Sequence, residues 1–143
     1  MNEIFPYAQQ VTGVLVLLVG FGFHFVGQLI SVINWNKAVQ WGLQEKSMPP
    51  EYRVYEHGIA VADVALAWVY GLAGVGLLLG AVWASKLAWF PGVLLPYHAI
   101  SAWCWTRNQK TNGHPLKSDT FWVVWCSANL LTGVLALATA WQG

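Results

Sequence analysis

Charged residues are scarce in this sequence of 143 residues: only 9% are Asp, Glu, Lys or Arg, whereas 57% are hydrophobic. A soluble domain of this length needs more polar side chains to cover its surface. The seven Lys and Arg residues nearly cancel the six Asp and Glu residues, so neither a nucleic-acid surface nor an acidic tail is predicted. The composition therefore predicts an integral membrane protein that contacts the lipid bilayer.

Cysteine is also rare. Cys104 and Cys126 show none of the spacings that are typical of zinc sites or redox pairs, and both lie in or beside apolar segments. We expect free, buried thiols. The nucleophile, zinc-hydrolase and phosphate-loop motifs GxSxG, HExxH and GxxxxGK are absent as well. The common hydrolases are thereby disfavoured, and whether the chain is an enzyme stays open.

Four apolar runs are long enough, or nearly so, for the roughly 20 residues that a helix needs to cross hydrocarbon. They cover about residues 11–35, 57–85, 87–105 and 120–141. Sustained alternation at period two is absent, so the backbone groups in lipid must pair within helices. The sequence predicts an all-α fold, an antiparallel four-helix bundle in the membrane that forms one domain over residues 1–143.

Positive charge is distributed unevenly between the connections. Loops 36–56 and 106–119 carry three Lys or Arg residues each, whereas Lys86 alone lies on the opposite side. The positive-inside rule therefore predicts that both loops are cytoplasmic and that both termini lie outside. We expect an integral protein of a bacterial inner membrane.

Two connections have local features. A very tight turn around Ser85 and Lys86 is expected to join the second and third spans as antiparallel neighbours. In the first loop, Trp35, Val39 and Leu43 recur at helical spacing, which predicts a short amphipathic helix at the membrane surface.

Polar side chains recur in every span, where each is costly unless it faces the interior of the bundle. In each of the four spans these side chains recur at helical spacing, so all of them can face the axis of the bundle. On a rise of about 1.5 Å per residue, most of them converge in the cytoplasmic half. The candidate ligand-binding residues are Asp63, His98, His24, Gln28, Asn129, Trp105, Trp122, Trp125 and Tyr70.

Each candidate has an expected role. Asp63 is the only formal charge within the spans and would anchor a ligand, while His24 and His98 would tune its protonation or shuttle protons. Gln28 and Asn129 would orient the ligand between tryptophan walls. In the simpler alternative, Asp63 pairs with a histidine and Asn129 joins two helices by hydrogen bonds. These polar residues would then only hold the helices together.

The sequence resembles the small four-span families of the DoxX and EXPERA kind. The resemblance rests on the run 58–63 (GIAVAD), the Gly-rich stretch Gly71–Gly80, and the Trp122, Trp125 and Asn129 arrangement. EXPERA-type sterol isomerases and sterol-binding proteins look similar in placing membrane acids, a His and an Asn/Trp helix around the ligand. This resemblance implies a sterol-like ligand, and the DoxX resemblance implies a link to quinones.

Three functions stay open. The favoured one is binding, or transforming, an apolar or amphipathic small molecule such as a lipid, a sterol-like compound or a quinone. The second is electron transfer through haem b with His24 and His98 as axial ligands, whose expected depths differ by about 6 Å; no other metal site is expected. The third is an accessory subunit of a larger membrane complex or a homo-oligomer, docking through small residues such as Gly76 and Gly80.

Overall fold

A computed structural model describes residues 7–114 and 116–142, and all of the regular structure in them is helical. The all-α prediction is confirmed for this part of the chain. The first column runs continuously through α1 (Ala8–Leu15), η1 (Val16–Gly27) and α2 (Gln28–Ile33), and η1 has the wider turns of a π-helix. The remaining helices are α3 (Trp35–Gln40), α4 (Pro50–Leu66), α5 (Trp68–Leu78), α6 (Val82–Leu87), α7 (Trp89–Thr111) and α8 (Asp119–Gln142).

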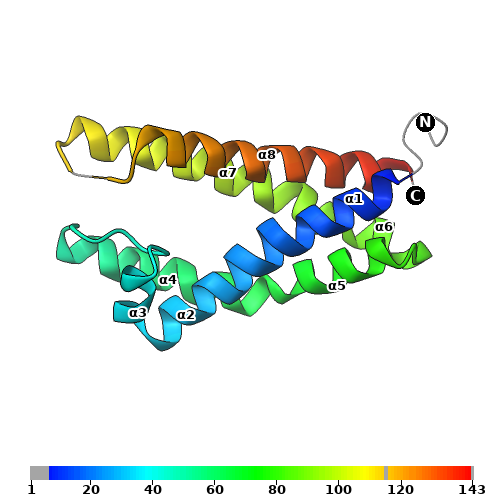
Figure 1. The fold of residues 1–143 in the computed structure, drawn as a ribbon, viewed down its shortest axis with the longest axis horizontal. Coiled ribbons are helices and arrows are strands. Elements are labelled where there is room, and N and C mark those ends of the chain that lie inside the picture. The colour runs from blue at the N-terminus through cyan, green and yellow to red at the C-terminus, as the bar shows by residue number, and fades with distance from the viewer. Residues whose placement is uncertain (1–6, 115, 143) are drawn as a thin grey trace.

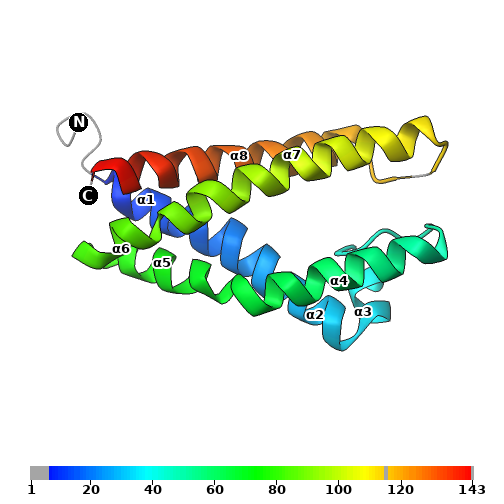
Figure 2. The same cartoon turned by 180° about the vertical axis from the view of Figure 1, so that it is seen from behind.

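The helices form two layers (Figures 1 and 2). One layer is the antiparallel pair α7 and α8, and the other contains the first column beside α5 and α4. The layers meet at the end where α1 begins and α8 ends, and they separate toward the end that carries α3, the start of α4 and the α7–α8 connection (Figure 1). Both loops predicted to share one side of the membrane therefore lie at the same end of the molecule.

Local signals in the sequence explain where several helices begin and end. Asn34 separates α2 from α3, and its side-chain oxygen accepts a hydrogen bond from the Lys37 amide at 3.0 Å, as an N-cap does. Pro50 occupies the first position of α4, where its missing amide hydrogen costs nothing. The short helix predicted in the first loop is thus present as α3, which ends at Gln40.

The turn after the second apolar run lies earlier than predicted. Gly80 has a φ of +67°, which lets the chain reverse after α5, whereas Ser85 and Lys86 lie within α6. The predicted turn at these two residues is therefore wrong. The second column is also not straight, because α4 and α5 meet at Ala67 with a bend of 42°.

Small residues bring the helices close together within the chain. A Cβ atom added to Gly133 would lie 2.3 Å from Pro96, so the proline ring of α7 packs directly on the α8 backbone. A Cβ atom at Gly76 would meet Trp83 at 2.5 Å. Since Gly76 packs inside the chain and Gly80 lies in a turn, the pair does not form the docking face that the sequence suggested.

Two helical segments, Ala8–Ile33 and Asp119–Gln142, are long and apolar enough to cross a membrane. The bent pair α4–α5 meets the same criteria when it is taken as one span. The α7 helix is not among these candidates. The two apolar helices indicate membrane association.

The contact between Pro96 and Gly133 predicts a position-specific effect on stability. We expect Gly133→Ala to lower the free energy of unfolding by about 1–3 kcal/mol, because the new methyl group overpacks the α7–α8 contact. Gly58→Ala is the matched control: no atom lies within 4 Å of its added Cβ, and helix propensity should stabilise that variant by about 0.5–1 kcal/mol. Unfolding in detergent micelles measures both, and equal effects would contradict the packing.

Candidate functional site

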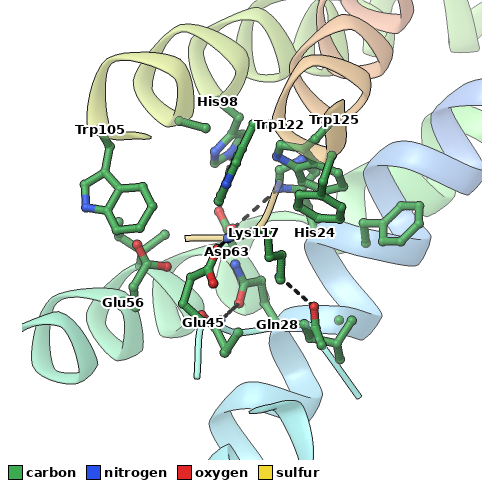
Figure 3. Close-up of a pocket in the computed structure, with 18 of the residues that line it drawn as sticks. His24, Gln28, Glu45, Glu56, Asp63, His98, Trp105, Lys117, Trp122 and Trp125 are labelled. Carbon is green, nitrogen blue, oxygen red and sulfur yellow. Dashed lines mark hydrogen bonds and ion pairs between the residues drawn. The ribbon is translucent and has the colours of Figure 1, made fainter. Parts of the chain in front are cut away.

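A cavity of about 510 Å³ opens between the two layers, at the end where they separate. Its walls come from η1, α4, α7 and α8, and its mouth is bordered by residues 41–45 and Lys117. Most of the lining is aromatic or aliphatic, and a few polar side chains converge at the inner end (Figure 3). This combination is typical of small-molecule sites.

Three ionisable side chains from three helical segments meet at the inner end of the cavity. Asp63 of α4 faces both histidines: its Oδ2 lies 3.7 Å from His24 Nδ1 of η1, and its Oδ1 lies 3.5 Å from His98 Nε2 of α7. The two imidazole rings overlap, with centroids 4.3 Å apart. We call these three residues the His–Asp cluster.

Asn129, which does not line the cavity, is hydrogen-bonded to His24. The Asn129 side chain is fully buried, its Nδ2 donates to the Trp125 carbonyl at 2.9 Å, and its Oδ1 lies 2.7 Å from His24 Nε2. Because a carbonyl only accepts, the amide nitrogen must face Trp125 and the amide oxygen must face His24. The Nε2 atom of His24 therefore carries the proton and donates it to Asn129.

Aromatic rings form the walls of the cavity. The ring of Trp125 lies 5.3 Å from that of His24, and Phe23 meets Trp125 edge-on at the same distance. Nearer the mouth, Trp105 contacts Trp122 at 5.8 Å. These rings offer flat apolar surfaces on two sides of the cavity.

Two buried polar atoms at the cavity have no hydrogen-bond partner among the described residues. They are Asp63 Oδ2, an acceptor, and Trp122 Nε1, a donor. Buried polar atoms in native proteins are nearly always paired, so each one calls for an explanation. Both belong to residues that line the cavity.

The structure places seven of the nine predicted site residues on the cavity and two behind it. Asn129 and Tyr70 are the two that do not line it; Asn129 supports His24, and the Tyr70 ring lies 6.1 Å from the His24 ring. The residues on the cavity are Asp63, His98, His24, Gln28, Trp105, Trp122 and Trp125.

Sequence reasoning missed the residues at the mouth. Gln44 folds back under the cavity, donates to Gln28 Oε1 at 3.3 Å and accepts from the Tyr52 hydroxyl at 2.9 Å. Glu45 and Glu56 bring two further carboxylates to the lining. The sequence does place Glu56 seven residues before Asp63 on the same helix face, but its position at the membrane boundary favoured an ordinary interfacial role, and the fold of residues 41–45 has no periodic signal.

Lys117 joins the two polar loops across the mouth. Its Nζ donates to the Gly42 carbonyl at 2.7 Å, and its backbone amide donates to Glu45 Oε1 at 3.3 Å. Burial lowers the pKa of Lys117, while the Glu45 carboxylate opposes that shift. The α7–α8 layer is thereby connected to the opposite layer at the end where the helices themselves separate.

The two histidines do not fit an axial haem pair as they lie. Axial imidazoles bind iron from opposite faces of the porphyrin and leave room for the macrocycle between them. Here the rings overlap at 4.3 Å, and the Nε2 of His24 is occupied by Asn129. We therefore derive no haem chemistry from this site.

Comparisons with known protein families, with curated proteins and with solved structures find no match to this chain. The resemblance to DoxX-like and EXPERA-like proteins gains no support from them. The roles of the site residues must therefore be argued from the geometry of the cavity alone.

The contact at the mouth predicts a local change in backbone dynamics. We expect Lys117→Met to speed amide hydrogen exchange in residues 42–45 by roughly fivefold, the effect of losing a hydrogen bond of about 1 kcal/mol. Lys46→Met, at an exposed position beside the same segment, is the control and should leave exchange there unchanged. Equal exchange in the two variants would show that Lys117 does not hold the loop.

Proposed function

We propose that the chain crosses a bacterial inner membrane four times, with the loop end of the molecule in the cytoplasm. Large apolar side chains are exposed on all four columns, including α7, where Val93 and Ile100 are 57% and 62% exposed. Such surfaces suit lipid, because water would not solvate them favourably. The basic loops at one end support the proposed orientation.

The proposed orientation can be tested by cysteine labelling. In a chain lacking its own thiols (Cys104→Ala, Cys126→Ala), we expect Val82→Cys at the exposed start of α6 to react with a membrane-impermeant maleimide in intact cells. Lys46→Cys should react only after the membrane is permeabilised. The reverse pattern, or labelling of both in intact cells, would rule out this topology.

We further propose that the cavity binds an apolar or amphipathic small molecule, of the lipid, sterol-like or quinone class. The observation that carries this proposal is one cavity in which apolar aromatic walls lead to a buried polar cluster with an unpaired Asp63 oxygen and an unpaired Trp122 donor. A ligand with an apolar body and a polar end would satisfy both parts. Water alone would leave the walls unfilled.

Each residue of the cavity would have a different role toward the ligand. Trp105 and Trp122 would lie against the body of the ligand, and the Trp122 Nε1 would donate to its polar end. Asp63 would accept from that end. Asn129 would act as a positioning residue through His24, a role different from the direct ligand contact that the sequence suggested.

A substitution that fills the cavity with a larger side chain tests ligand binding without removing a polar group. We expect decylubiquinone, cholesterol or phosphatidylethanolamine to stabilise the protein purified in detergent against heat. At a probe concentration of one hundred times the Kd, the free energy of unfolding should rise by about 2.7 kcal/mol. Ala102→Phe places a ring in the cavity and should abolish the increase. Ile100→Phe, on the exposed face of the same helix, should keep it.

The three probes also separate the ligand classes, since the class that binds should stabilise the wild-type chain and the Ile100→Phe variant alike. If none of the probes stabilises the wild type, or if Ala102→Phe responds as the wild type does, the cavity is not the binding site for these compounds.

A further inference from the structure

The His–Asp cluster has the donor atoms of a metal site. We propose that His24 Nδ1, His98 Nε2 and one Asp63 carboxylate oxygen bind a divalent first-row transition metal ion at the inner end of the cavity. One donor atom from each of these three residues lies within 4.8 Å of the other two. Two imidazoles and one carboxylate are a common ligand set for such ions. The proposal does not depend on what fills the rest of the cavity.

The first argument is the protonation of His24. Asn129 fixes the proton on Nε2, so in the neutral ring the Nδ1 atom presents a bare lone pair toward Asp63 Oδ2, itself an acceptor. Two lone pairs that face each other in a buried site repel unless a proton or a metal ion lies between them. A metal ion satisfies both, and it also explains why Asp63 Oδ2 has no hydrogen-bond partner among the described residues.

The second argument is distance. Metal–ligand bonds of about 2.0–2.2 Å in tetrahedral geometry place neighbouring donor atoms roughly 3.4 Å apart. The two histidines face different oxygens of the Asp63 carboxylate: Oδ2 lies 3.7 Å from His24 Nδ1, and Oδ1 lies 3.5 Å from His98 Nε2. Both distances are close to that separation. A proton shared by either pair would instead draw the atoms to about 2.7–2.9 Å, the length of a charged hydrogen bond.

The third argument is the surroundings of the cluster. Metal-bound histidines usually donate their second nitrogen to a polar partner that fixes the ring, and Asn129 is that partner for His24. Three protein ligands leave at least one coordination position vacant, and all three residues line the cavity (Figure 3). The ion would therefore meet the polar end of a molecule in the cavity.

Zinc and cobalt binding to the full chain tests the site. We expect the protein, purified in detergent, stripped with EDTA and reloaded, to retain about one Zn²⁺ per chain by elemental mass spectrometry. Co²⁺ should give the visible absorption bands of a nitrogen- and oxygen-ligated ion. Asp63→Ala and His98→Ala should each lose the bound metal and the bands. His57→Ala, which removes an exposed histidine of α4, should keep both.

Asn129 provides a second test, in which no ligand atom changes. We expect Asn129→Leu to weaken Zn²⁺ binding about 10–100-fold, because His24 loses the acceptor that orients it. Asn129→Asp keeps an acceptor for His24 and should restore most of the affinity. Circular dichroism at the helical and tryptophan bands shows whether each variant is folded.

Two results would overturn the proposal. One is a folded wild-type chain that retains no Zn²⁺ or Co²⁺ after desalting. The other is metal retained equally by the wild type, Asp63→Ala and His98→Ala, which would place the ion elsewhere. Neither result bears on the binding of the lipid, sterol and quinone probes, because stabilisation by those probes is to be compared in EDTA-treated and in Zn²⁺-loaded protein.

Discussion

The amide of Asn129 makes two hydrogen bonds on which the geometry of the site depends. It donates to the Trp125 carbonyl and accepts from His24, so it joins α8 to η1 at the depth of the cavity. Leaving either buried group unpaired would cost about 1–3 kcal/mol, which restricts the side chain to this orientation. The proton position on His24 and the ring nitrogen that faces Asp63 both follow from it.

The cavity exists because the two layers pack unequally along their length. At one end the two layers touch directly, as where the Thr139 hydroxyl of α8 donates to the Thr12 hydroxyl of α1 at 3.3 Å. At the other end the layers separate and larger rings line the space between them (Figures 1 and 2). The sequence follows the same division, since the small residues gather in one half of the columns and most tryptophans in the other.

Much of the fold and part of the site could be predicted from the sequence. Apolar runs gave the helices, charge placed both loops at one end, and helical spacing brought His24, Asp63 and His98 together, because each of these signals is periodic or cumulative. The turn at Gly80 was missed, since hydropathy continues unbroken through it and only a positive φ marks the reversal. Gln44, Glu45 and Lys117 were missed because a loop that folds back on a cavity has no period.

The contact between Lys117 and the 41–45 segment concerns the exchange of a ligand, a property that is usually linked to its affinity. For the ligand proposed above, side chains deep in the cavity, such as Asp63, would set how tightly it is held, whereas the mouth is held by one lysine donating to Gly42 and one amide donating to Glu45. Its residence time and its equilibrium affinity would then be controlled by different parts of the chain. Substitutions in the loops can change how fast the site exchanges its contents without altering its preference among them.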